Sequence, residues 1–322
     1  MDMISQITDA LRSYTKSDGS IGIIVENEII PIEQSRFWPI IPENNKTLTF
    51  IDGGQAELIK APNFSVQFIR IAASTWKGKE RISQNKTEFY LILQSENKHG
   101  TAQGLTYTGK IFSINGMQLI NEQDINFLAN DPTLRIGTKN ADISQIGNVV
   151  RRFAELSLAS QSEADIVVLD GTLDQTFSKE QSYLEKLQNN VCALAKTSNI
   201  FTTNGAAAAS VLNEHGPLGA WSFQLTPTKS IVKLHPKTDY LFLFESKQPN
   251  SKAIQSLASQ SQDPVFLGYP YGLIWADKIA RVSHEEASLL RTQLFVHLGK
   301  DAEKIKKYTA AVNAHDVLDS IG

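Results

Sequence analysis

Three acidic residues occupy positions from which their carboxylates could meet at one site. Asp52 follows the run Thr47–Ile51, Asp170 follows the run Ile166–Leu169, and a glycine comes after each acid. Runs of β-branched, aromatic and aliphatic residues predict buried strands, so both carboxylates are expected at strand ends. Glu155 belongs to a segment whose apolar residues recur every three or four positions, which predicts an amphipathic helix.

Two strand acids and a helix acid are the residue types that phosphodiester hydrolysis uses. The reaction must stabilise an attacking water and a leaving alkoxide, and two divalent ions about 4 Å apart do both. Hard carboxylate oxygens suit Mg²⁺ or Mn²⁺, and clustered carboxylates are tolerated mainly because such ions neutralise them. Asp52, Glu155 and Asp170 therefore predict a two-metal phosphodiesterase centre.

The same residues allow other interpretations. The stretch around Asp170 resembles the D-x-D-G-T motif of haloacid-dehalogenase-type phosphatases, but Val168 stands at the nucleophile position and cannot attack phosphorus. Asp-Gly pairs are common at turns, and Glu155 follows Arg151 by four residues, the spacing of a surface ion pair. An actin-like ATPase would need a second glycine-rich phosphate loop besides Gly53-Gly54.

The order of the predicted elements indicates the fold. Three strand patterns joined by short connections favour an antiparallel meander. A helical pattern over 143–156 follows, then the strand that ends at Asp170 and a further strand over 191–196. This is the order of ribonuclease-H-like folds, in which the acids converge at one edge of the sheet. The predicted strands of the meander are Thr47–Asp52, Phe64–Ala72 and Thr87–Gln94.

We therefore expect an α/β protein with a ribonuclease-H-like mixed sheet, three antiparallel strands plus parallel strands, flanked by helices. Helical patterns over 285–298 and 301–313 predict a helical C-terminal part. No repeat or low-complexity tract interrupts the chain, so residues 1–322 are expected to form one domain. Its parts would be an N-terminal helix and loop over 1–45, the core over 46–246, and the helical part that completes the site over 247–322.

Composition narrows the function classes. The 322 residues are 41% hydrophobic and 20% charged, which is typical of a globular protein. The formal net charge of −3 gives no general attraction to nucleic acid, so DNA must be met by local basic patches. The single Cys192 excludes an internal disulfide and fits a reducing cytoplasm. No apolar run approaches the ~20 residues that span a bilayer, and no signal peptide is evident at Met1–Ile4.

One basic stretch could contact DNA. Between Arg70 and Lys86 the chain carries five cations, one acid and one tryptophan. A basic turn with an aromatic residue could hold a phosphate chain and stack a base, although a solvated hairpin tip is the alternative. Binding through such a patch would be directed at the backbone and sensitive to salt. The candidate DNA-binding residues are Arg70, Trp76, Lys77, Lys79 and Arg81.

Five short motifs, taken in order, resemble those of the NurA nuclease family. The resemblance covers roughly residues 45–315. It implies a manganese-dependent nuclease (or one that uses Mg²⁺), with two ions. The expected activities are 5′-to-3′ exonuclease and single-strand endonuclease in DNA end resection, on single-stranded DNA and double-stranded ends. The family works as homodimers with the hexameric HerA translocase. The motifs are Ile51–Gly54, Arg151–Glu155, Leu169–Leu173, Ala195–Ser198 and Gly268–Asp277.

The resemblance also implies roles for individual residues. Asp52, Glu155, Asp170 and Asp277 would be the metal-binding acids. Many relatives place a histidine near the last of these, and an aspartate is equally suitable for Mn²⁺ or Mg²⁺. His315 is the alternative fourth ligand.

Two further residues complete the expected catalytic set. Tyr269 would hold a metal-bound water or a phosphate oxygen, and Lys196 would balance charge in the transition state. A different class of function remains open, namely a non-catalytic adaptor subunit of a DNA motor that keeps the same fold. Such an adaptor would have no need to hold costly like charges together.

Overall fold

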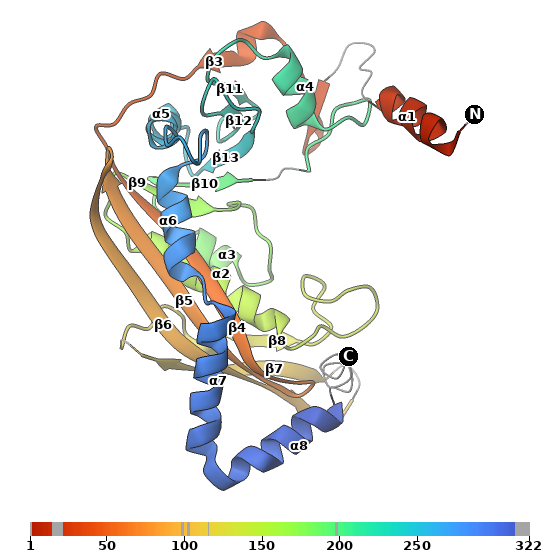
Figure 1. Ribbon diagram of the computed structural model, residues 1–322, viewed down its shortest axis with the longest axis vertical. Helices are drawn as coiled ribbons and strands as arrows, with labels where there is room; N and C mark the ends of the chain where they lie inside the picture. The colour runs from red at the N-terminus through yellow and green to blue at the C-terminus, as the bar shows by residue number, and fades with distance from the viewer. Residues whose placement is uncertain are drawn as a thin grey trace.

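A single mixed sheet runs through the protein. The computed structural model describes residues 2–14, 22–97, 100–101, 104–114, 116–196 and 199–312. Within this part eleven strands form one twisted sheet (Figure 1). In their spatial order they are β3 (Phe37–Pro39), β11 (Trp221–Gln224), β12 (Lys229–Lys233), β13 (Phe242–Ser246), β10 (Val191–Ala195), β9 (Ile166–Asp170), β4 (Thr47–Ala61), β5 (Phe64–Lys77), β6 (Glu80–Asn97), β7 (Leu105–Ser113) and β8 (Asn126–Leu128).

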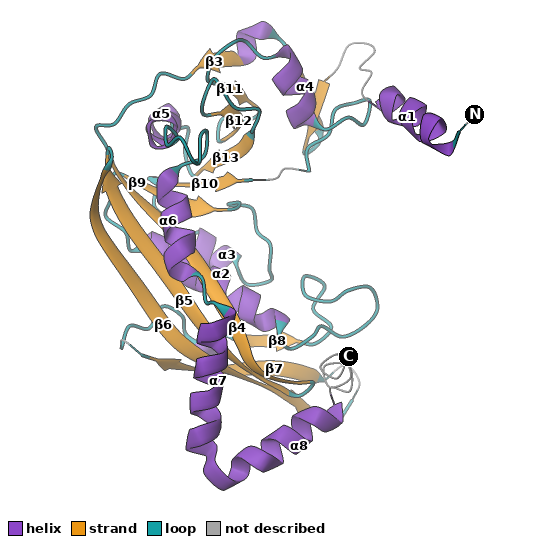
Figure 2. Ribbon diagram, in the orientation of Figure 1, coloured by secondary structure: helices purple, strands orange, loops and turns teal. Residues whose placement is uncertain are grey.

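Helices cover both faces of this sheet (Figure 2). A separate hairpin of β1 (Gly22–Val25) and β2 (Glu28–Pro31) shares a hydrophobic cluster with β3 and β11. None of the described helices is long and apolar enough to cross a membrane. The helices are α1 (Met3–Tyr14), α2 (Gln145–Ser160), α3 (Gln181–Leu184), α4 (Ala208–His215), α5 (Ser251–Gln260), α6 (Tyr271–Ala280), α7 (His284–Leu298) and α8 (Ala302–Val312), with 3₁₀ turns at Gln34–Arg36, Glu122–Asp124 and Gly299–Asp301.

Strand β4 is the centre of the fold. It pairs with β5 antiparallel on one side and with β9 parallel on the other. Because successive side chains of a strand point to opposite faces, Ile51 packs under α2 and Phe50 packs under α6. Two hydrophobic cores therefore meet at this strand, one on each face of the sheet.

The structure confirms the mixed sheet and the helical C-terminal part, and it corrects several boundaries. The strand expected to stop at Asp52 continues to Ala61, because Gly53 and Gly54 are extended and keep their places in the ladder opposite Ile71 and Arg70. Between β9 and β10, residues 181–184 form only the single turn of α3. No element was expected at strands β7 and β12 or at helix α5. Their apolar patterns are short, and short patterns do not separate regular elements from loops.

Helix α6 approaches β4 very closely through a glycine. A Cβ atom added to Gly272 would lie 2.1 Å from the ring of Phe50. That distance is far inside van der Waals contact, so the helix can reach the sheet only where a side chain is absent. The aspartate at position 277 is carried toward β4 by the same helix.

We expect the substitution Gly272→Ala to destabilise the protein by about 1–3 kcal/mol through overpacking. The sign of the change in the free energy of unfolding is informative, because the same exchange at an exposed helix position stabilises a protein by up to about 1 kcal/mol. Urea unfolding measures the difference, with Lys278→Ala on the exposed side of α6 as the control. An unchanged or raised free energy of unfolding for Gly272→Ala would contradict the close packing.

Candidate active site

Two of the predicted acids lie side by side on neighbouring parallel strands. In the pairing of β4 with β9, Phe50 stands opposite Val168 and Ile51 stands opposite Leu169. The next step of this register places Asp52 beside Asp170. Phe50 and Val168 belong to the core under α6, and side chains alternate, so both aspartates point to the α6 face.

Glu155 reaches the same region from α2, on the other face of the sheet. Its side chain is almost fully buried and accepts a hydrogen bond from Arg151 Nη1 at 2.8 Å. Arg151 Nη1 also donates to the carbonyl oxygen of Gly53 at 2.9 Å. A Cβ atom at Gly53 would lie 2.4 Å from Glu155 Oε1, so this glycine makes room for the carboxylate next to Asp52.

The motif that contains Tyr269 and Asp277 supplies the remaining side chains. The Tyr269 hydroxyl donates to Asp170 Oδ2 at 3.5 Å. Asp277 on α6 is partly exposed and pairs with Arg281 Nη2 at 2.8 Å. A Cβ atom at Gly54 would lie 2.1 Å from the carbonyl oxygen of Ala280, so the end of α6 rests directly on β4.

Lys196, the residue after β10, lies beside Asp170. Its ammonium group donates to Asp170 Oδ2 at 2.6 Å and stands 5.2 Å from the centre of the Tyr269 ring. Strand β10 is parallel to β9, with Leu194 opposite Asp170, so its end carries the lysine to the site. The structure therefore brings together all six residues that sequence reasoning named for catalysis.

The electrostatics of this cluster are those of crowded carboxylates. Burial, together with the negative charges of Glu155, Asp170 and Asp277, raises the pKa of Asp52 to about 7. Burial also raises the pKa of Glu155, although Arg151 opposes the effect. The pKa of Tyr269 is raised by burial and by the charges of the neighbouring aspartates, so its hydroxyl remains a proton donor.

The donor set fits a hard divalent cation in its chemistry, but the side chains are not closed around one. Among the residues that the structure describes, no three acids, histidines or cysteines surround a common point. Instead cations of the chain pair with three of the acids, through Arg151, Lys196 and Arg281. Within the described ion pairs Asp52 has no such partner and accepts only from the Gly53 amide at 2.8 Å. His315, the alternative ligand, lies outside the described residues.

Sequence reasoning missed the residues that fix the loop after Asp170. Buried Glu245 on β13 accepts from the Thr172 hydroxyl at 2.6 Å and from the Leu173 amide. Buried Glu180 accepts from Arg152 Nε at 2.8 Å and from two amides of the same loop. Glu245 directly follows the apolar run Leu241–Phe244, and an acid at the end of such a run was the available signal.

The structure corrects two of the five candidate DNA-binding residues. Arg70 is buried and pairs with Glu88 and Glu286, which ties β5 and β6 to α7. Trp76 is buried against aromatic rings of α6. Both side chains lie on the face of the long β5 strand that α6 and α7 cover. The strand pattern alone does not show which face helices cover, so it could not predict this burial.

The other three candidates lie at or next to the β5–β6 turn. Lys77, Lys79 and Arg81 are exposed. Arg81 stacks over the ring of Trp275 at 4.6 Å. A basic hairpin tip is therefore present, which is the alternative that the sequence left open, and Trp76 is not part of its exposed surface.

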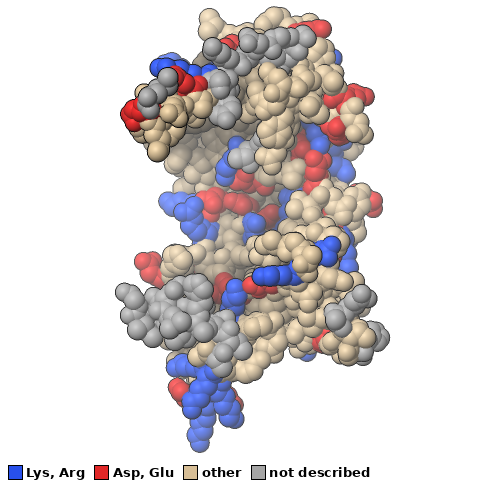
Figure 3. All heavy atoms as spheres, turned by 90° about the vertical axis from the view of Figure 1, so that its right-hand side faces the viewer, with Lys and Arg blue, Asp and Glu red and all other residues tan. Residues whose placement is uncertain are grey.

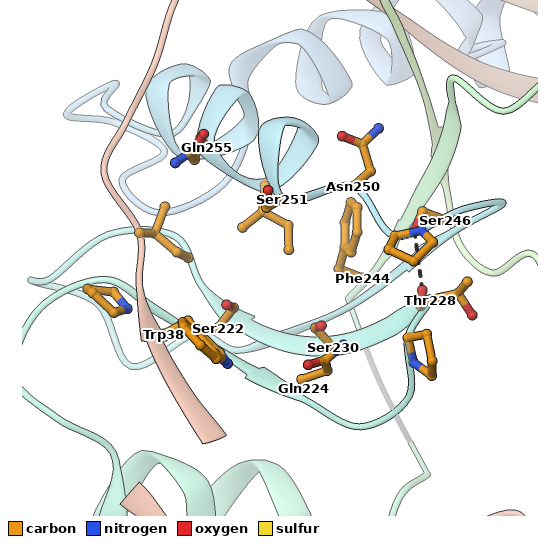
Figure 4. Close-up of a pocket in the computed structure, with 15 residues that line it drawn as sticks. Trp38, Ser222, Gln224, Thr228, Ser230, Phe244, Ser246, Asn250, Ser251 and Gln255 are labelled. Carbon is orange, nitrogen blue, oxygen red and sulfur yellow. Dashed lines mark hydrogen bonds between the residues drawn. The ribbon is translucent and has the colours of Figure 1, made fainter. Parts of the chain in front are cut away.

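The acids lie on the side of the molecule toward which β9 and β10 run. Figure 3 shows this side, where acidic and basic side chains gather in a hollowed middle region. A different cavity, of about 390 Å³, lies between β11–β13 and α5 (Figure 4). Its lining, which includes Trp38, Ser230 and Asn250, has no charged side chain. We therefore place the candidate active site at the acids rather than in that cavity.

The raised pKa of Asp52 predicts a pH dependence of stability. In the folded state this carboxyl keeps its proton up to about pH 7, whereas in the unfolded chain it releases the proton near pH 3.8. The folded state therefore loses stability as pH rises between these values. The variant Asp52→Asn stays neutral at every pH. We expect its free energy of unfolding, relative to that of the wild type, to rise over this interval by on the order of 3 kcal/mol in chelator-treated buffer.

The measurement is urea unfolding at a series of pH values, and Asp165→Asn is the control. Hydrogen bonds from the Thr47 amide and hydroxyl lower the pKa of Asp165, so its contribution to stability is lost only as pH falls. That variant should differ from the wild type by a constant amount above about pH 5. A constant difference for Asp52→Asn as well would contradict the crowding of carboxylates.

Comparison with solved structures supports the fold. The NurA nuclease from Sulfolobus solfataricus matches with a TM-score of 0.52 and 15% identity over 92% of this chain and 94% of that chain. Endonuclease V of Ciona intestinalis in complex with an inosine-containing DNA matches with a TM-score of 0.40 and 12% identity, over 78% and 92% of the two chains. The catalytic domain of human endonuclease V matches with a TM-score of 0.36 and 9% identity, over 81% of this chain and 92% of that chain.

No protein-family model and no curated protein sequence matches this chain. The two endonuclease V scores are too low to establish a shared fold, so the assignment rests on the NurA structure, which aligns over nearly the whole of both chains. The mixed sheet and its flanking helices agree with the ribonuclease-H-like architecture that the order of the predicted elements indicated. The chain has a NurA-like fold.

Proposed function

We propose that this protein is a metal-dependent nuclease that hydrolyses DNA phosphodiester bonds. The single observation that carries the proposal is the position of Asp52. It lies beside Asp170 at the junction of two strands, with Glu155 and Asp277 close enough to help raise its pKa to about 7. A protein that did not use this cluster would gain stability by replacing one of the acids.

Asp52, Asp170, Glu155 and Asp277 would hold Mn²⁺ or Mg²⁺, and room for two ions is part of the proposal. When bound, such ions supply Lewis-acid stabilisation of the attacking and leaving oxygens. The Tyr269 hydroxyl remains protonated, so it can donate a hydrogen bond to a phosphate oxygen. Lys196 supplies a positive charge at the same place, where negative charge grows during hydrolysis.

DNA would reach the acids along the hollowed side of the molecule. The exposed cations Lys77, Lys79 and Arg81 lie at the β5–β6 turn, at the end of the sheet where β4 and β9 begin. They would contact phosphates of DNA that extends past the acids to that end. The family resemblance supports 5′-to-3′ exonuclease and single-strand endonuclease activity in DNA end resection. The buried thiol of Cys192, whose pKa is raised by burial, is compatible with work in the cytoplasm.

We also propose a homodimer and a HerA-like hexameric translocase as partners. The resemblance to NurA supports both. The exposed apolar face of α1 also supports a protein partner, because large apolar side chains on a projecting helix are costly in water. That face consists of Met3, Ile4, Ile7 and Leu11. Sedimentation of the purified chain, alone and with a HerA-type ATPase, tests the two assemblies.

One observation favours a second candidate, a non-catalytic adaptor with the same fold. Lys196, Arg151 and Arg281 each neutralise one of the acids without any metal ion. A protein that had lost catalysis could keep such pairs as structural links. Asp52 opposes this candidate, since no described cation pairs with it.

Hydrolysis of linear DNA with Mn²⁺ separates the two candidates. We expect Asp52→Asn and Asp170→Asn each to lower the rate by about 100-fold or more while the fold is retained, because each removes a ligand oxygen from the reacting centre. Asp165→Asn is the matched control, since it lies five residues before Asp170 at the opposite end of β9. Wild-type protein that cleaves no DNA with either metal would support the adaptor.

Metal binding can be measured without turnover. We expect Mn²⁺ to raise the unfolding temperature of the wild type, by the stabilisation that a ligand gives to the folded state, about 2.7 kcal/mol at 100 times its dissociation constant. Asp170→Asn should lose most of this gain, and Asp165→Asn should keep it. An equal Mn²⁺ response in all three proteins would place the metal elsewhere.

Lys196 offers a sharper test of its role. Its ammonium group occupies Asp170 Oδ2, so it competes with a metal for that oxygen. We expect Lys196→Met to bind Mn²⁺ more tightly and yet to hydrolyse DNA more slowly, because the transition-state charge loses a cation. Slower hydrolysis with weaker Mn²⁺ binding would show instead that the lysine only supports the fold of the site.

A further inference from the structure

We propose that a cavity beside the acids is a subsite for one unstacked nucleotide of a single DNA strand. The inference rests on the proposed nuclease function and adds a place where one base of a single-stranded substrate would bind. The cavity has a volume of about 470 Å³, which is in the range of sites for small organic ligands. Its walls are the segments 237–240 and 265–267 together with Tyr269.

Tyr269 connects this nucleotide subsite to the candidate active site. Its ring forms part of the cavity wall, while its hydroxyl donates to Asp170 Oδ2 at 3.5 Å. Lys196 lies 5.2 Å from the same ring. A base held in the cavity would therefore leave its own phosphate near the lysine and the aspartate, where hydrolysis is proposed to occur.

The cavity presents aromatic surface that the core does not use. Tyr240 is 64% exposed and Phe266 is 42% exposed, each from a different wall. Val265 beside them is 79% exposed. Exposed aromatic rings are the surfaces on which proteins stack unpaired bases, whatever their sequence.

The two walls are held in place before any ligand binds. Gly268 has a φ of +87°, and a Cβ atom there would lie 2.6 Å from Thr238 Oγ1, so the loops touch. The Gly268 amide donates to the carbonyl oxygen of Ser261, and the Thr238 hydroxyl donates to that of His235. A preformed site of this kind loses little conformational freedom on binding.

The charges of the cavity also suit a single strand rather than a duplex. Lys237 and Asp239, both exposed, cancel, so the site has no strong field for a phosphate chain. Affinity must then come mainly from stacking, and a base inside a duplex has both faces already covered. The subsite therefore favours strands whose bases are free.

The test compares Tyr240→Ala, Phe266→Ala and the ring-preserving control Tyr240→Phe. Fluorescence anisotropy in chelator-treated buffer would use three probes: a short labelled oligothymidine, a duplex of the same length and a strand of that length made of abasic sites. We expect each alanine variant to bind oligothymidine roughly 5- to 100-fold more weakly. Tyr240→Phe should stay within about 2-fold of the wild type, because the ring remains.

The other probes decide whether stacking is the cause. The abasic strand should bind the wild type and Tyr240→Ala equally, and duplex affinity should change by less than about 2-fold. Under turnover with Mn²⁺, Tyr240→Ala should raise KM for oligothymidine more than it lowers kcat. Leu218→Ala, at an exposed apolar residue away from the cavity, controls for general surface effects.

Three results would overturn the inference. The first is unchanged binding of oligothymidine by both alanine variants, and the second is an equal loss of affinity for all three probes. The third is a changed sedimentation of the alanine variants with unchanged DNA affinity, which would make the cavity a protein interface. The proposed function fails in a different outcome, in which the wild type binds oligothymidine but cleaves it with neither Mn²⁺ nor Mg²⁺. In that outcome the subsite would stand without the nuclease.

Discussion

The structure depends on holding like charges together in a partly buried space. Asp52 and Asp170 lie on adjacent strands, and Glu155 enters from the opposite face of the sheet. Crowded carboxylates repel one another and lose hydration. The repulsion is reduced because the pKa of Asp52 is raised and because cations pair with Glu155 and Asp170. A divalent cation would relieve the same repulsion, so the site is arranged to gain from binding one.

The glycines of the central strand make this arrangement sterically possible. Gly53 leaves space for the Glu155 carboxylate on the α2 side, and Gly54 leaves space for the end of α6 on the other side. Gly272 lets α6 rest on the Phe50 ring. Helices on both faces therefore come closer to β4 than ordinary side chains would permit, and they bring acids from distant parts of the chain to one place.

Buried ion pairs away from the acids hold the surrounding elements. Arg70 links β5 to α7 through Glu286, while Glu245 and Glu180 fasten the loop that follows Asp170. Removing one partner of such a pair would leave a buried charge unpaired, which destabilises the fold far more than the loss of a surface pair. The elements around the candidate site are thus held together by residues other than the six named for catalysis.

The sequence by itself determined the acids, the order of strands and helix, and the mixed sheet, because period-two and helical patterns, and acids that follow apolar runs, are local signals. Only the tertiary structure decided that Arg70 and Trp76 are interior, that β4 continues past Asp52, and that Glu245 serves the site. A side chain's partners depend on which elements pack across it. Spacing along the chain carries no record of packing between elements that are far apart in sequence.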